Sequence, residues 1–208
     1  MELCCLARAA YSDAKHNFVL HYILAAAILI FSPLLFNAAE YNERQAAQPL
    51  EIIISLIGII LITPIFLPEQ NESICDVVRS KKLPYLCTCL MRLFFSLIIL
   101  ICLIGGFILY MKYCNSQVTF RLFCGTVATA LALGSIGFFA AGISNNVIIG
   151  YMASIFYYIM NFSLKDKLGN FYLFSMIQGS FEEKKWLCVL SVALIVSTFA
   201  YLKLIKKR

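Results

Sequence analysis

The sequence predicts an all-α integral membrane protein with about six transmembrane helices, for three reasons. Of its 208 residues, 62% are hydrophobic and 13% are charged, whereas soluble domains have roughly 45–50% and 25%. The apolar residues fall in runs of roughly 17–22, close to the ~20 that a helix needs to cross a hydrocarbon core of ~30 Å. Because backbone amides find no water partner in hydrocarbon, each run must satisfy them internally, as a helix does.

Six such runs divide the chain, which we treat as one membrane domain, residues 1–208. The first run is expected to stay as a span, because it is longer than the apolar part of a signal peptide and acidic residues precede it. Ser144, Asn145 and Asn146 alone separate the fourth and fifth runs, and asparagine suits such a tight turn. Five or seven spans are the alternatives. The predicted spans are residues 18–36, 50–67, 93–111, 122–143, 147–164 and 186–202.

The distribution of Lys and Arg predicts which loops face the cytoplasm. With both termini inside, ten basic residues lie on the inner face and seven on the outer face. The densest clusters, Arg79–Lys82 and Lys206–Arg208, fall on the same side. Since cytoplasmic loops are enriched in Lys and Arg, we expect a cytoplasmic (inner) membrane protein with both termini and loop 68–84 inside. Residues 37–48 and 165–185 are then outside.

The loop after the second run carries the main candidate site. Residues 68–82 predict a short amphipathic helix: Pro68 suits a first helical position, and acidic residues precede basic ones, as the helix dipole favours. Ile74, Val77 and Val78 form one apolar stripe. This stripe can dock in a groove of a cytosolic partner or lie on the lipid surface. The candidate partner-binding residues are Glu69, Glu72, Ile74, Val77, Val78, Arg79, Lys81 and Lys82.

Two further segments predict helices at the membrane surface. Residues 1–17 place Leu3, Leu6 and Ala10 on one face, which is typical of an interfacial elbow helix, with contact to a specific partner as the alternative. Segment 165–185 is apolar and aromatic, yet too short and interrupted to cross. This pattern indicates amphipathic or re-entrant helices at the outer leaflet, or else a loop with an aromatic belt.

The fourth run is rich in small residues at a spacing of four, as in Ala130/Gly134 and Gly137/Ala141. Such pairs allow membrane helices to approach closely. These four residues therefore predict either a packing face within the chain or a face towards a second subunit or a transported substrate.

The sequence lacks the patterns that catalysis in a membrane would need. No ionisable residue lies near the middle of a run, since His21, Glu51 and Arg92 are all near ends; this disfavours a proton relay or an ion-driven carrier. There is no phosphate-binding loop, no His-Glu-x-x-His and no Cys-x-x-Cys among the nine cysteines. We expect no catalytic residue, cofactor or metal site here. Topology and anionic lipid, rather than nucleic acid, explain the net charge of +6.

The architecture and the loop after the second span resemble the permease subunit of a type-2 ABC transporter. The likeness rests on the six spans, the elbow, and the order of residues Leu67–Gln70, Ile74, Val77, Val78 and Arg79–Lys82. The semi-apolar residues 171–181 before the last span are also similar to the outer helices of that family. The chain departs from the family in its shortness and its small first outer loop, which leaves the class of cargo open.

The resemblance implies a fold, a set of partners and a role. The chain would pair with a second permease chain, identical or not, and with two cytosolic ABC ATPase subunits that bind ATP and Mg. Residues 68–84 would form the coupling loop, and the cargo would be an amphipathic or hydrophobic peptide, lipid or drug-like compound that is exported. The rival interpretations are a non-transport membrane protein that confers immunity or scaffolds a complex and, less favoured by the residues, an intramembrane enzyme.

Overall fold

The computed structural model describes residues 18–36, 41–70 and 85–205, which lie almost entirely in helices. Five helices are long and apolar enough to cross a membrane: Glu43–Pro68, Leu86–Tyr113, Phe120–Ser144, Val147–Leu164 and Glu182–Leu204. The first predicted span forms a shorter apolar helix of 17 residues, Val19–Leu35. The all-α, multi-pass architecture is thus confirmed, with five candidate spans where about six were expected. The predicted elbow, residues 1–17, lies outside the described residues.

The second, third, fourth and sixth spans extend beyond the apolar runs that predicted them, whereas the first helix is one residue shorter at each end and the fifth keeps the predicted bounds. The second span begins at Glu43, inside the polar stretch 37–48, where the Gln45 side chain accepts a hydrogen bond of 3.1 Å from the backbone N–H of Asn42. The elements are α2 (Val19–Leu35), α3 (Glu43–Ile52), η1 (Ile54–Leu56), α4 (Ile57–Ile62), η2 (Thr63–Gln70), α6 (Tyr85–Tyr113), α7 (Phe120–Ser144), α8 (Val147–Leu164), η3 (Lys165–Phe171), α9 (Ser175–Gln178) and α10 (Glu182–Ile205).

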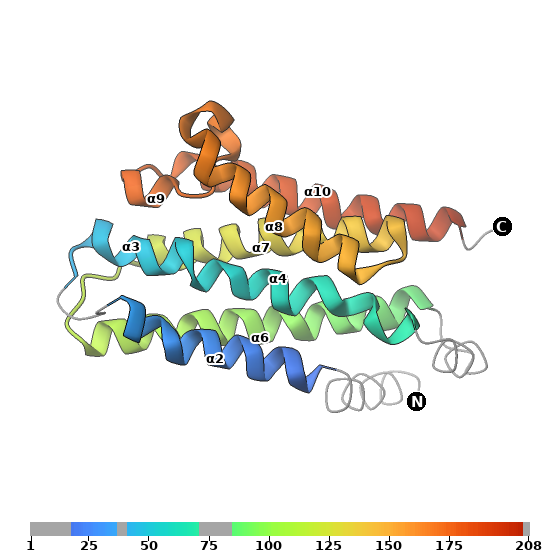
Figure 1. The fold of residues 1–208 in the computed structure, drawn as a ribbon, viewed down its shortest axis with the longest axis horizontal. Helices are drawn as coiled ribbons and strands as arrows, with labels where there is room; N and C mark the ends of the chain where they lie inside the picture. Colours follow the sequence, from blue (N-terminus) through green and yellow to red (C-terminus); the bar gives the residue numbers. More distant parts are fainter. Residues whose placement is uncertain (1–17, 37–40, 71–84, 206–208) are drawn as a thin grey trace.

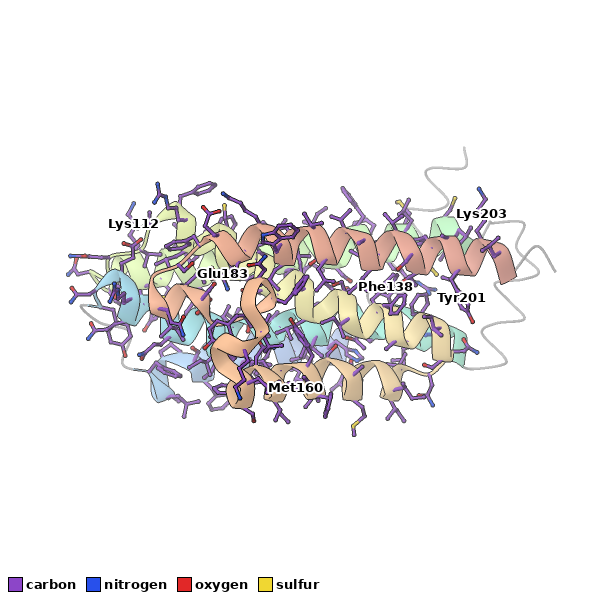
Figure 2. The ribbon with its side chains drawn as sticks, turned by 90° about the horizontal axis from the view of Figure 1, so that it is seen from above. Lys112, Phe138, Met160, Glu183, Tyr201 and Lys203 are labelled. Carbon is purple, nitrogen blue, oxygen red and sulfur yellow. The ribbon has the colours of Figure 1, made fainter. Side chains whose placement is uncertain are left out.

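The long helices lie side by side and alternate in direction along an elongated bundle (Figure 1). At one end, the tight turn between α7 and α8 lies near the last residues of α10; this is called the turn end. At the other end, residues 165–181 fold as η3 and α9 between α8 and α10; this segment is called the cap. Figure 2 shows the same polarity, with Lys112 and Glu183 towards the cap end and Tyr201 and Lys203 towards the turn end.

Helix α7 is the centre of the bundle and packs against α4, α8 and α10. Near the turn end, the Phe138 ring of α7 stacks on Phe66 of η2, with ring centroids 4.7 Å apart. The ring centroid of Phe199 in α10 lies 5.7 Å from that of Phe138. The outer faces of α2, α6, α8 and α10 carry exposed apolar side chains, such as Leu34 and Met152. A bundle with a packed centre and an apolar exterior is what lipid surroundings require.

The four small residues singled out in the sequence, Ala130, Gly134, Gly137 and Ala141, are all buried in the interior of α7. A Cβ atom built on Gly134 would lie 2.6 Å from the carbonyl oxygen of Gly58 in α4. On the α8 side, a Cβ built on Gly150 would lie 2.6 Å from the carbonyl oxygen of Gly137. These glycines therefore allow the backbones of α4, α7 and α8 to come together within one chain.

The second span changes from α-helix to 3-10 helix at Thr63. A buried arginine supplies a hydrogen bond that this 3-10 helix lacks. In a 3-10 helix, the carbonyl of residue i accepts a hydrogen bond from the N–H of residue i+3, but Pro68 has no N–H to donate to Ile65. Arg92 of α6, 4% exposed, donates instead from Nη1 to the Ile65 oxygen at 3.3 Å. Arg92 thus ties the start of α6 to the end of the second span.

Replacing Arg92 with methionine is expected to lower the free energy of unfolding by about 1–3 kcal/mol, because it leaves a buried carbonyl without this donor. The matched control is Lys112→Met, which removes an exposed cation from the other end of the same helix and should change stability little. Thermal unfolding of both purified variants in detergent measures the difference. Equal melting temperatures for the two variants would mean that Arg92 does not support η2.

Candidate functional site

The most distinctive polar feature of the described residues is an ion pair buried at the cap end. The Lys184 Nζ atom of α10 lies 2.5 Å from Glu51 Oε1 of α3, and the two residues are 5% and 0% exposed. They are 133 positions apart in the sequence. A charged group inside a membrane bundle is costly unless it is paired, so each residue requires the other.

Every polar atom of this pair has a partner. Besides Glu51, the Lys184 ammonium donates to Thr129 Oγ1 of α7 at 2.8 Å and to the Leu173 carbonyl oxygen of the cap at 2.5 Å. These three acceptors match the three N–H donors that an ammonium group has. A fully satisfied pair of this kind keeps two opposite charges fixed at one place.

The Glu51 carboxylate holds the cap by its backbone. The amide N–H groups of Met176 and Ile177, in α9, donate to Glu51 Oε1 and Oε2 at 3.0 and 3.1 Å. First-turn amides have no partner within a helix, and a carboxylate is a strong acceptor for them. Glu51, Lys184 and Thr129 therefore join α3, α7 and α10 to the cap.

A glycine allows the chain to leave α9 and enter α10. Gly179 has φ +88°, a left-handed conformation that side chains rarely adopt. Its Cβ position also lies 3.3 Å from Nε and Nη2 of Arg44, a residue of α3. The Ser180 N–H then donates to the Ser175 oxygen at 3.0 Å, closing the turn that brings Lys184 back towards Glu51.

Helix α8 fixes the other half of the cap. The buried Asn161 side chain accepts a hydrogen bond from the Leu173 N–H at 2.9 Å, and Tyr157 donates its hydroxyl to the Phe171 oxygen at 2.7 Å. The Phe174 ring packs 4.5 Å from Phe162, measured between ring centroids. The cap is thus attached to the bundle from two sides, by charge on one side and by amide, hydroxyl and aromatic groups on the other.

This arrangement holds the cap in place through contacts that use the polar atoms of both side chains. The ammonium has no donor left over, and the carboxylate is occupied by three N–H groups. Within residues 18–36, 41–70 and 85–205, no group of three His, Cys, Asp or Glu side chains gathers to hold a metal ion. The contacts of Glu51 and Lys184 with Leu173, Met176 and Ile177 act as a lock between the cap and the bundle.

The residues proposed from sequence for partner binding lie mostly outside the described chain. Glu69 falls in η2, which places Pro68 and Glu69 at the end of the second span and not at the start of a separate helix. Figure 1 places the described flanks of this loop, the end of η2 and the start of α6, at the turn end. The other proposed residues are outside the described ranges: Glu72, Ile74, Val77, Val78, Arg79, Lys81 and Lys82.

Sequence reasoning missed the ion pair. It treated Glu51 as a residue near the end of a run and placed Lys184 in the outer segment 165–185, whereas Lys184 belongs to the first turn of α10. One signal was available: Glu51 is the only charged residue within 50–67, and a lone charge in an apolar run calls for a partner. Nothing in the local sequence indicates which cation that partner is.

Comparison of the chain with protein-family models, with curated proteins and with solved structures yields no match.

Proposed function

We propose that this chain is the permease subunit of an ATP-driven ABC exporter in the cytoplasmic membrane, with its turn end in the cytoplasm. The cargo is amphipathic or hydrophobic: a peptide, a lipid or a drug-like compound. ATP and Mg are bound by separate cytosolic ATPase subunits, and this chain contributes no catalytic group. The topology that follows places both termini and residues 68–84 inside and the cap outside.

The observation that carries the proposal is the attachment of the two described flanks of loop 68–84, η2 and α6, to the bundle. A coupling element must transmit a push, so its flanks need to be fixed to buried helices. One flank, η2, continues α4, which is buried against α7, and Arg92 ties this flank to α6 at the other. A force on the loop would therefore reach α4 and α7 together.

The close packing of α4, α7 and α8 bears on where a cargo would pass. Backbones that meet at Gly58, Gly134 and Gly150 leave little room for a path between these helices. In our proposal, the path forms between this chain and a second permease chain, identical or different. The outer apolar faces of the bundle would supply the contacts, and the locked cap would close the path on the outside.

The same close packing also favours the second candidate function, a non-transport membrane protein that confers immunity or scaffolds a complex. Such a protein needs a stable bundle and no path. It would have no need of an ATPase, so the two candidates differ in what binds to loop 68–84.

The test is Val77→Asp in the predicted stripe of the loop, made in the complex purified from native membranes. If Val77 seats in a groove of an ABC ATPase, the aspartate places an unpaired charge there, at a cost of several kcal/mol, and the co-purified ATPase is expected to be lost. Reversing Lys81 and Lys82 at the exposed end should matter less, since solvent and salt screen those charges.

The measurement is the ATPase-to-permease ratio and the ATP turnover of the complex at equal membrane expression. Loss of ATPase with Val77→Asp, and retention with the reversed lysines, supports coupling through this loop. An unchanged ratio and turnover with Val77→Asp would assign the stripe to the lipid surface instead, and the exporter proposal would lose its coupling element.

A further inference from the structure

A pocket of about 480 Å³ lies between α7 and α10, beside the ion pair. On α7 the wall consists of Arg121 and three small residues, Cys124, Gly125 and Ala128, which share one face of the helix. Because these three side chains are small, they leave a groove that larger side chains would fill. On α10 the wall is the charged first turn followed by Cys188. The lining residues are Arg121, Cys124, Gly125, Ala128, Phe181, Glu182, Lys184, Lys185 and Cys188.

The pocket is polar at one end and apolar at the other. Arg121 and Lys185 lie in the first turns of α7 and α10, whereas Ala128 and Cys188 lie further along these spans, towards their middle. Next to the charged end, Trp186 is 51% exposed, and tryptophan is enriched at the level of the lipid headgroups. The charged end is therefore at headgroup depth, and the apolar end reaches into the hydrocarbon.

Among the described residues, one cation at the pocket has no ion-pair partner. The exposed Lys185 pairs with Glu182 at 2.9 Å, and Lys184 is neutralised by Glu51. The Glu183 carboxylate accepts a hydrogen bond from the Ser180 hydroxyl. Arg121 is exposed and has no ion pair within the described ranges. The guanidinium group is well suited to a phosphate oxygen pair.

We propose that this pocket binds an anionic phospholipid, with the phosphate diester on Arg121 beside Lys185 and the first part of an acyl chain over Cys124, Ala128 and Cys188. The volume is within the range of small-molecule sites. A soluble anion would contact Arg121 but not the apolar end of the pocket. A phospholipid would contact both, with its phosphate at headgroup depth and its acyl chain in the hydrocarbon. The inference requires only that the bundle spans a bilayer, and so it stands or falls separately from the exporter proposal.

Binding at this pocket is expected to affect the cap, because the two share residues. Lys184 lines the pocket and also holds Glu51 and Leu173. Gly125 lines the pocket and faces the Met176 side chain of α9, which occupies the space that a Cβ would need. A bound lipid would therefore restrict motions of α7 and α10 that open the lock, and it should raise the melting temperature of the protein.

The experiment measures lipid retained by the full chain in detergent, by native mass spectrometry, after addition of phosphatidylglycerol or phosphatidylcholine. Wild type is expected to retain about fivefold more phosphatidylglycerol, the size of one basic contact at a membrane surface. Arg121→Gln should abolish this preference. Lys112→Gln, which removes another exposed cation at the cap end, should preserve it. Cys188→Leu, which fills the apolar floor, should lower retention of both lipids.

Three results would overturn the proposal. Equal preference in Arg121→Gln and Lys112→Gln would show that the protein's general charge, not this pocket, attracts the lipid. Unchanged retention of both lipids in Cys188→Leu would show that the acyl chain does not lie in this groove. Displacement of phosphatidylglycerol by millimolar inorganic phosphate would identify a soluble anion as the occupant. Because Arg121 and Lys112 are both exposed, melting temperatures without added lipid should be equal and would verify that the variants fold.

Discussion

Replacing Lys184 with methionine is expected to destabilise the folded bundle by about 3–5 kcal/mol, because removal of one partner from a buried ion pair leaves the other charge uncompensated. The methionine side chain is similar in length to lysine, so the change removes the charge and the three hydrogen bonds without leaving a large cavity. The Glu51 carboxylate would keep only the amide donors of Met176 and Ile177. Unfolding of the purified chain in detergent measures the loss.

The adjacent residue supplies a matched control. Lys185→Met makes the same chemical change one position further along, but the Lys185–Glu182 pair is exposed on both sides, at 74% and 81% of the side-chain surface. Exposed pairs contribute little to stability, so this variant should unfold close to wild type. If Lys184→Met and Lys185→Met unfold alike, the buried pair does not stabilise the bundle.

A double variant distinguishes the loss of a charge from the loss of packing. In Glu51→Gln/Lys184→Met, no net charge is buried, and the glutamine oxygen still accepts from an amide of α9. This variant is expected to be more stable than Lys184→Met alone, since contacting residues are not additive. Limited proteolysis within the cap gives a second readout, with faster cleavage expected in Lys184→Met than in the double variant.

The sequence predicts the helices well because hydrocarbon imposes one simple requirement, and each predicted run corresponds to a helix. The bounds of four of the six shift outwards, since a helix can continue with polar residues once it leaves the apolar layer, whereas Val19–Leu35 and Val147–Leu164 do not. The start of α3 at Glu43 and the inclusion of Lys184 in α10 both show this. Hydropathy reports where a helix must be apolar and not where its hydrogen bonding ends.

The ion pair is a different kind of feature. Its two charges are 133 positions apart in the sequence, and they meet because α3, α7 and α10 pack together at the cap end. Glu51 by itself indicates that a partner is needed, but the choice of Lys184 over the other cations depends on the direction of the cap. That direction is set by Gly179 and by Asn161, which no periodicity reveals.

The small residues of α7 show an intermediate case. Spacing alone predicts that Ala130, Gly134, Gly137 and Ala141 face a closely approaching surface, and in the structure they lie against α4 and α8. In the structure that surface belongs to two helices of the same chain, because Gly58 of α4 and Gly150 of α8 allow their backbones to approach α7. The apolar stripe of loop 68–82 stays a prediction, since Ile74, Val77 and Val78 lie outside the described residues.

Gly58→Ala is expected to be the most damaging methyl addition in the bundle. The new Cβ would overlap the carbonyl group and Cα of Ala130, so rotation of a side chain cannot relieve the contact and α4 must move away from α7. Overpacking of this kind costs about 1–3 kcal/mol, and more where backbone is involved. Gly106→Ala is the matched control: its Cβ meets nothing within 4 Å, and alanine favours the helix by up to about 1 kcal/mol.

The two changes should therefore shift the melting temperature in opposite directions, although each adds one methyl group to a membrane helix. Gly125→Ala should fall between them, because the atom in its way belongs to the flexible Met176 side chain. Ala130→Gly should not rescue Gly58→Ala, since the Ala130 atoms nearest to the new Cβ belong to the backbone. A melting temperature for Gly58→Ala at or above that of Gly106→Ala would contradict the close approach of α4 to α7, and with it the argument that a cargo must pass between two chains.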